Sequence, residues 1–262
     1  MSLASFNVHS GVDTRGHAYD VVEACAELDA DVVVLQESWQ PDGEAKSTAA
    51  LVAEALGYRF VEQPTARTKL HGPIEALSPR VGSQLGRVYG PLLFEGEDTR
   101  GARRAHEGRP FRTGRWGVAV LSRVPVSDTT ILPLGKLRGD YAQRVAIRCD
   151  VEIGGRTLAV IGTHMSHLSQ GSPLQYLRLR RLLPPSSRPA VLAGDMNLWG
   201  PPVSAAFPGW RRAVRGRTWP ADQPHSQVDH VLVTPSVTVV EGSVAPDLGS
   251  DHRAVRVVLS FT

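Results

Sequence analysis

The chain has 262 residues, of which 42% are hydrophobic and 21% charged, and this composition indicates an ordinary globular protein rather than a disordered or fibrous one. A chain of this length folds without a structural metal or a disulfide framework. The two cysteines match no zinc-finger or CxxC spacing, which disfavours a structural zinc site and a disulfide scaffold. The net charge of +3 is by itself only a weak indication of nucleic-acid binding.

No stretch is apolar over about 18 residues, and the N-terminus lacks the basic and apolar regions of a signal peptide. We therefore expect no integral membrane segment and a cytoplasmic location, unless a leader has been removed.

Short β-branched runs recur along the whole chain and predict strands. In chain order they are 3–6, 31–35, 116–121, 145–153, 157–161, 190–193, 228–233 and 254–261. Helical periodicity over 21–28, 51–56 and 172–183 predicts helices between them. Weak periodicity and frequent Gly, Pro and Arg between 64 and 115 predict a long irregular insertion that could line or cover a site. We find no repeat or linker and expect a single domain over 1–262.

Polar side chains stand at the ends of several predicted strands. Early in the chain they follow their strands, and near the C-terminus they precede them: Asn7, Glu37, His164, Asp195, Asn197, then Asp229, Asp251 and His252. A single such residue is usually a turn former, but chance turn residues would not all be metal-binding or titratable. If the last strands run antiparallel to the earlier ones, these side chains meet on one rim.

Carboxylates with an amide oxygen suit Mg²⁺, and carboxylate with imidazole also suits Mn²⁺. Phosphoester hydrolysis requires these parts, since it needs a cation, a base for water and donors for the developing charge. The rim residues therefore include the parts that metal-dependent phosphoester hydrolysis needs.

The motifs around these residues resemble the endonuclease/exonuclease/phosphatase superfamily, which includes DNase I, AP endonucleases, neutral sphingomyelinases and inositol-phosphate 5-phosphatases. The matching segments, in the family's order, are Ser5-Phe6-Asn7, Val34-Leu35-Gln36-Glu37, the run from Trp116 to Arg123, Gly162-Thr163-His164, Gly194-Asp195-Met196-Asn197, Val228-Asp229-His230-Val231 and Ser250-Asp251-His252. The resemblance implies an α/β fold, a four-layer α/β/β/α sandwich of two mixed sheets with helices on the outside.

The resemblance also implies a metal site. Glu37 would be the principal carboxylate for Mg²⁺ or Mn²⁺, with Asn7 and Asp251 completing the metal environment directly or through water.

The catalytic roles implied by the resemblance fall on five residues. Asp195 and Asn197 would position the attacking water and the phosphate. His252, oriented by Asp229, would contact the phosphoryl group or act as general base. His164 would stabilise the pentacovalent state or assist the leaving group.

Substrate contacts are expected from a further set of residues: His9, Arg115, Tyr141, Arg144 and His167. His9 stands where AP endonucleases tend to carry Asp, and His164 where they carry a Tyr-containing segment. These differences favour the DNase-like, sphingomyelinase-like or phosphatase-like branches over abasic-site repair.

The leading functional hypothesis is a monomeric phosphodiesterase in which water attacks phosphorus directly, with nucleic acid as the favoured substrate. The alternative substrate is a phospholipid, sphingomyelin or an inositol phosphate, and the remote alternative is a catalytically silent phospholigand-binding module. Arginines of 100–115 that face the rim would favour the nuclease.

Overall fold

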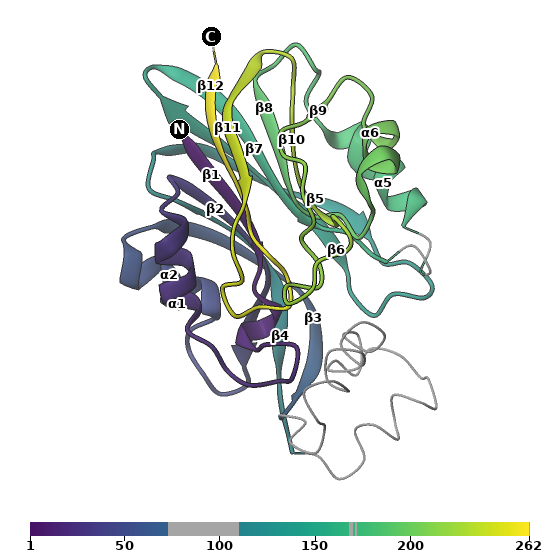
Figure 1. Cartoon of the computed structure of the whole chain (residues 1–262). Coiled ribbons are helices and arrows are strands. Elements are labelled where there is room, and N and C mark those ends of the chain that lie inside the picture. The colour runs from purple at the N-terminus through teal and green to yellow at the C-terminus, as the bar shows by residue number, and fades with distance from the viewer. Residues whose placement is uncertain (73–109, 168–169, 171, 262) are drawn as a thin grey trace.

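The computed structural model describes residues 1–72, 110–167, 170 and 172–261. In these residues two mixed six-stranded sheets pack against one another (Figure 1). The first sheet has the strand order β11 (Val237–Val244), β12 (Val255–Phe261), β1 (Ser2–Asn7), β2 (Val32–Pro41), β4 (Phe111–Ser122), β3 (Arg59–His71).

The second sheet is built from the middle of the chain. Its strand order is β5 (Val126–Gly135), β6 (Arg144–Ile153), β7 (Arg156–His164), β8 (Ala190–Asp195), β10 (Asp229–Val233), β9 (Arg211–Arg212).

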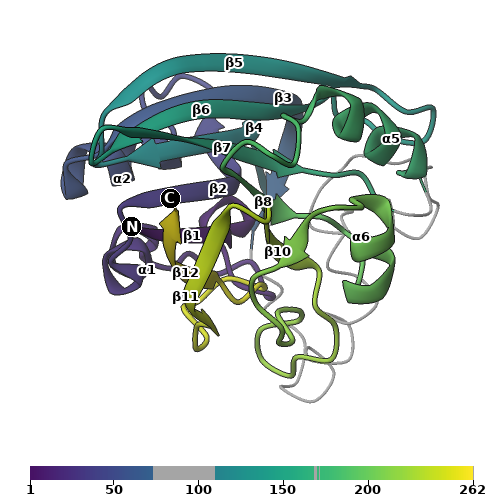
Figure 2. The ribbon, with the colours of Figure 1, turned by 90° about the horizontal axis from the view of Figure 1, so that it is seen from above.

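Helices cover the outer face of each sheet and complete the four layers. A buried cluster joins the first sheet to α1 (Val21–Leu28) and α2 (Thr48–Leu56), and another joins the second sheet to α5 (Pro173–Leu182) and α6 (Gly200–Ala206). Seen from above, the two helix pairs lie on opposite sides of the sheets (Figure 2). The expected α/β/β/α sandwich is confirmed.

The inner faces of the two sheets share the largest apolar cluster, which is rich in valine. Gly162 on β7 sets how closely they approach. A Cβ atom at this position would lie 2.7 Å from Val34 Cγ1 on β2 and 2.9 Å from Val120 Cγ2 on β4. The glycine therefore allows the strand that carries His164 to pack directly on the opposite sheet.

Strand direction brings the predicted rim together. β1 and β2 are parallel, as are β7 and β8, so the carboxyl ends of each pair lie at one edge. β12 pairs antiparallel with β1, and β10 with β8, so the residues that precede β12 and begin β10 reach the same edges.

The structure corrects the expected insertion at both of its ends. Residues 64–71 continue β3 and residues 111–115 begin β4, and these two strands pair with one another. The intervening 73–109 lie outside the described residues. The strands β3, β5, β9 and β11 and the short helix α6 were not predicted.

Among the helices of the described residues, none has the length and apolar character needed to cross a membrane.

Candidate active site

Three of the expected residues form a row across the second sheet. His164 at the end of β7 is in register with Asp195 at the end of β8, and Asp195 is in register with Asp229 at the start of β10. Residues in register on adjacent strands project to the same face, so the pairing alone places these side chains together. All three are at least 96% buried, with exposed fractions of 4%, 1% and 0%.

The first sheet contributes Asn7 and Glu37. Asn7 ends β1, and Glu37 lies where the pairing of β2 with β4 shifts register between Gln36 and Ser38. Glu37 has a φ of 58°, a left-handed conformation that is rare for a residue with a side chain. Such a bulge redirects a side chain that regular alternation would place elsewhere, and strained backbone of this kind gathers at functional sites.

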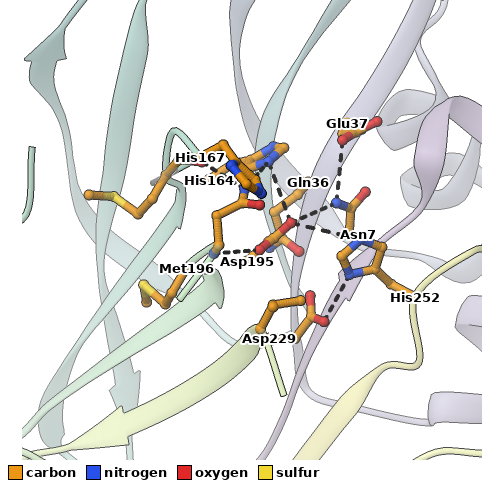
Figure 3. Close-up of polar contacts among 12 residues, drawn as sticks. Asn7, Gln36, Glu37, His164, His167, Asp195, Met196, Asp229 and His252 are labelled. Atoms are coloured by element: carbon orange, nitrogen blue, oxygen red, sulfur yellow. Dashed lines mark hydrogen bonds and ion pairs between the residues drawn. The ribbon is translucent and has the colours of Figure 1, made fainter. Parts of the chain in front are cut away.

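Asn7 joins the two sheets. Its Nδ2 donates to Asp195 Oδ2 over 3.1 Å and contacts Glu37 Oε1 at 3.4 Å. The amide therefore bridges the carboxylates contributed by β2 and β8 (Figure 3).

The segment before β12 closes the site. The hydroxyl of Ser250 donates to the carbonyl of Asn7 over 2.7 Å, which ties this segment to the end of β1. His252 then places its Nδ1 2.9 Å from Asp229 Oδ2, with its Nε2 3.9 Å from both Asp195 Oδ2 and Asp251 Oδ1. The expected orientation of His252 by Asp229 is present in the structure.

Asp195 lies at the centre of the group. Its Oδ1 accepts the backbone N–H of Asn197 over 2.8 Å, and its Oδ2 lies 3.5 Å from His164 Nε2. Burial raises the pKa of the Asp195 carboxyl, and repulsion by the Asp229 carboxylate raises it further. Asp195 is therefore a stronger base than an exposed aspartate.

The two histidines on either side of Asp195 are held in opposite charge states. Burial acts to lower the pKa of His252, but the carboxylates of Asp229 and Asp251 outweigh it and raise the pKa well above its ordinary value. Burial, together with the positive charges of Arg144 and His252, holds the pKa of His164 well below its ordinary value. These opposite pKa shifts favour the cationic form of His252 and the neutral form of His164.

Asn197 is fixed beside His164. It has a φ of 49°, and its Nδ2 donates to the carbonyl of Met165 over 2.9 Å and lies 3.3 Å from His164 Nε2. Asparagine tolerates this left-handed conformation better than most residues.

The donor set around Glu37 fits a hard divalent cation. Burial raises the pKa of the Glu37 carboxyl, and the negative charge of Asp251 raises it further. Two carboxylates that repel one another in a partly buried site are stabilised by a cation beside them. Glu37 and Asp251 offer the oxygen ligands that Mg²⁺ prefers. The amide oxygen of Asn7 accepts the backbone N–H of His9 over 3.1 Å and has a second lone pair that could bind the same ion.

A second group of residues also offers metal ligands. Among the described residues, Asp195, Asp229 and His252 have ligand atoms within 4.8 Å of one another. The hydrogen bond between His252 Nδ1 and Asp229 Oδ2 uses one ligand atom of each residue, whereas His252 Nε2 and the buried, unpartnered Asp229 Oδ1 remain able to bind a metal. The hydrogen-bonded pair also suits the handling of a proton.

The five expected substrate contacts have different surroundings. His9 is buried, with its Nδ1 3.0 Å from the carbonyl of Val12 and 3.5 Å from Asp251 Oδ1. His167 is exposed on the loop after β7. Tyr141 is half-buried, and burial and the Glu37 carboxylate raise the pKa of its hydroxyl.

Arg115 is described with no contact to the central group, whereas Arg144 contacts the backbone of His164. Arg115 is exposed and donates to Gln40 Oε1 over 3.0 Å, on a part of β2 beyond Glu37. Arg144 was expected to contact the substrate; it is only 5% exposed and is held by Asp140, with Nε 2.8 Å from Oδ2.

Two aromatic residues at the site were not predicted. The Trp116 ring centre lies 5.3 Å from that of His164, and the Trp219 ring centre lies 6.5 Å from that of His252. Trp116 is the first residue of the matched run from Trp116 to Arg123, and this position in a motif is the sequence signal that could have indicated it.

Comparisons with known proteins agree with this arrangement. The model of the Endonuclease/Exonuclease/phosphatase family matches residues 4–252, whereas a comparison with curated proteins finds no match. Among solved structures, an endonuclease/exonuclease/phosphatase family protein from Leptotrichia buccalis C-1013-b is similar with a TM-score of 0.65 and 16% identity over 100% of both chains.

Two further solved structures have similar folds. Mannosyl-6-phosphatase Bt3783 from Bacteroides thetaiotaomicron VPI-5482 has a TM-score of 0.61 and 15% identity over 100% of both chains. D. rerio TDP2 complexed with single strand DNA product has a TM-score of 0.61 and 17% identity, covering 99% of this chain and 98% of that chain. At these identities the likeness shows the fold alone.

The matched span includes every rim residue from Asn7 to His252, and the two sheets have the architecture of the similar structures. The chain belongs to the endonuclease/exonuclease/phosphatase family, whose members are phosphoesterases.

Proposed function

We propose that the protein is a divalent-metal-dependent phosphodiesterase in which water attacks phosphorus directly. The observation that carries this proposal is the environment of Asp195. This buried carboxylate accepts hydrogen bonds from Asn7 and Asn197 and lies between His252, whose cationic form is favoured, and His164, whose neutral form is favoured. Two histidines in opposite charge states beside one base suit a displacement in which charge develops on several phosphoryl oxygens.

Glu37, Asp251 and Asn7 would hold Mg²⁺ or Mn²⁺. The chemistry that such a cation supplies is neutralisation of the phosphoryl oxygens and activation of water.

Asp195 accepts the proton of the attacking water. Its raised pKa brings its basicity closer to neutral pH, where a general base is most effective. The donors on both of its oxygens, from Asn7 and Asn197, fix the carboxylate for an in-line approach to phosphorus.

His252 and His164 act on the phosphoryl group from opposite sides of Asp195. Cationic His252, oriented through Nδ1 by Asp229, directs Nε2 to a phosphoryl oxygen. Neutral His164, with Asn197 beside it, hydrogen-bonds the leaving oxygen.

We propose nucleic acid as the substrate. A polar pocket of about 250 Å³ lies between residues 40–44, Arg67 and Arg115. Gln40 is three residues beyond Glu37 on β2, about 10 Å along the strand, so Arg115 can contact a phosphate next to the one that is cleaved. The printed description of TDP2 with a DNA product gives a precedent within the same fold.

Two observations favour a lipid or a small phosphate ester as the alternative substrate, which the test below distinguishes from nucleic acid. Arg67 pairs with Asp42 and Arg112 with Glu44, which reduces the positive charge available to a polyanion. The similar mannosyl-6-phosphatase shows by its name that the fold also serves a sugar phosphate.

We propose a cytoplasmic, monomeric enzyme. The two cysteines are buried and unpaired, which is compatible with a reducing compartment.

The test is turnover of a diester dye, plasmid DNA, RNA, sphingomyelin and inositol phosphates, each with Mg²⁺, with EDTA, and with Mg²⁺ restored after EDTA. We expect EDTA to abolish turnover and restored Mg²⁺ to recover it, with DNA or RNA the best substrate and its rate falling steeply with salt. The absence of turnover on every substrate by protein shown to bind Mg²⁺ would favour a silent phospholigand-binding module. A preference for sphingomyelin or inositol phosphate would overturn the nuclease assignment alone.

A further inference from the structure

The two histidines of the site are oriented by different means. His252 is fixed by the hydrogen bond between its Nδ1 and Asp229. His164 is 4% exposed, yet its Nδ1 has no hydrogen-bond partner among the described residues. Its imidazole is therefore held by the contacts of Nε2 with Asn197 and Asp195, over 3.3 and 3.5 Å, and by the packing of its ring.

An aromatic ring from the opposite sheet holds the imidazole. Trp116 on β4 is 2% exposed, and its ring lies 5.3 Å from that of His164 with an angle of 46° between the planes. Tyr141 packs edge-on against Trp116, with ring centres 5.8 Å apart. The Trp116 ring is thus fixed on two sides.

Arg144 acts on both the ring and the backbone. Its guanidinium carbon lies 5.1 Å from the centre of the Trp116 ring, and its Nη1 donates to the backbone carbonyl of His164 over 3.5 Å. Asp140 accepts from Arg144 Nε and Nη2 over 2.8 and 3.4 Å and also accepts from the hydroxyl of Ser166. Both members of this ion pair are at least 95% buried, with exposed fractions of 5% and 3%.

We propose that Arg144 and Trp116 are positioning residues for His164: the Asp140–Arg144 ion pair fixes the backbone at the end of β7, and Trp116, held under Arg144, fixes the imidazole. This proposal deepens the proposed function, since it rests on the role of His164 at the leaving oxygen.

The charges around His164 support the assignment. Asp195 faces its Nε2 from β8, His252 approaches from the segment before β12, and Arg144 lies behind it on β6. After burial, the positive charge of Arg144 is the largest influence that lowers the pKa of His164. Arg144 therefore helps to keep the imidazole neutral as well as in place.

The test compares three variants with the wild-type protein. Arg144→Met combined with Asp140→Asn removes both buried charges, so that neither is left uncompensated. Trp116→Leu removes the ring, and Trp116→Phe keeps an aromatic ring as the conservative variant. The matched control is Arg148→Met combined with Asp150→Asn. This ion pair lies on the same strand, β6, also includes Arg188 from outside the strand, and is described with no contact to His164.

Two measurements are made on each variant, kcat and KM for a diester dye and the NMR titration of the His164 imidazole in metal-free protein. We expect kcat to fall about 10- to 100-fold in the double variant and in Trp116→Leu, with little change in KM, since small displacements of a catalytic group act on the chemical step. His164 titrates at higher pH in the double variant. Trp116→Phe recovers most of kcat, and the control changes neither readout.

Unchanged kcat and an unchanged His164 titration in the folded variants would overturn the proposal. If the double variant does not fold, Trp116→Leu decides the question, because unchanged kcat and unchanged imidazole resonances there would also overturn it. A wild-type protein without phosphoesterase activity would refute the proposed function, whereas the titration would still test the positioning of His164.

Discussion

Replacing Asp229 by Asn removes the charge that orients and supports His252 while preserving the size of the side chain. The 2.9 Å contact joins Asp229 to a histidine that is cationic in the folded protein. A hydrogen bond to a charged group contributes about 1.5–3 kcal/mol. If that contribution is expressed at the transition state, kcat/KM falls about 10- to 150-fold.

The same substitution changes the pH dependence in a defined direction. The carboxylates around His252 raise its pKa, with Asp229 the largest of them, so activity that requires cationic His252 is lost only at high pH. Without the Asp229 charge the pKa of His252 falls, and the alkaline loss of activity begins at lower pH.

The assay is the pH profile of kcat/KM for a diester dye, with the His252 imidazole followed by NMR. Asp150→Asn is the matched control. Asp150 is also a buried aspartate of the second sheet, but the ion pairs described for its side chain are those with Arg148 and Arg188. The reasoning would be refuted by an Asp229→Asn enzyme whose kcat/KM stays within about threefold of wild type, with its alkaline limb unmoved.

Three other substitutions test the packing, the buried ion pair and the metal site. Gly162→Ala places a Cβ 2.7 Å from Val34 Cγ1 and should cost about 1–3 kcal/mol of unfolding free energy in urea. Gly139→Ala should cost far less, because the nearest atom to its Cβ among the described residues is 3.6 Å away. Burial acts to raise the pKa of the Asp140 carboxyl, but the partners of Asp140 outweigh burial and lower the pKa. The difference in unfolding free energy between wild type and Asp140→Asn should therefore be full above about pH 4 and shrink as the pH falls further. A difference that does not vary with pH would contradict this. Glu37→Gln should weaken Mg²⁺ binding by at least about tenfold in calorimetry, and unchanged affinity would place the metal elsewhere.

The strands that the sequence predicted are those inside the sheets, and the missed ones are at the edges. β3, β5, β9 and β11 are the four outermost strands of the two sheets. An edge strand has one neighbour and more exposed residues, so it needs neither a continuous apolar run nor strict alternation. β3 and β5 also contain Pro64 and Pro133, which lie at register shifts and lack the N–H that a regular strand donates to its neighbour.

The sequence predicted those site residues that stand at the ends of strands. It did not predict the side-chain positions that depend on strand pairing or on packing between the two sheets. Asn7, Asp195 and His252 follow from position along the chain once strand direction is known. The register shift that turns Glu37 toward Asn7 leaves no mark in the sequence, because it depends on the pairing of β2 with β4. The burial of Arg144 likewise depends on Asp140 and on Trp116 from the other sheet, so its sequence position suggested an exposed substrate contact.

The most direct measurement is Mg²⁺-supported phosphodiester turnover by wild type and Asp195→Asn, purified side by side. Asn keeps the shape of the side chain but cannot accept a proton from water, and a general base contributes about 10²- to 10⁴-fold to rate. We predict that kcat falls by at least about 100-fold while the variant still binds Mg²⁺ and unfolds as a cooperative unit. A kcat within about threefold of wild type would contradict the claim that Asp195 is the base at the centre of the site.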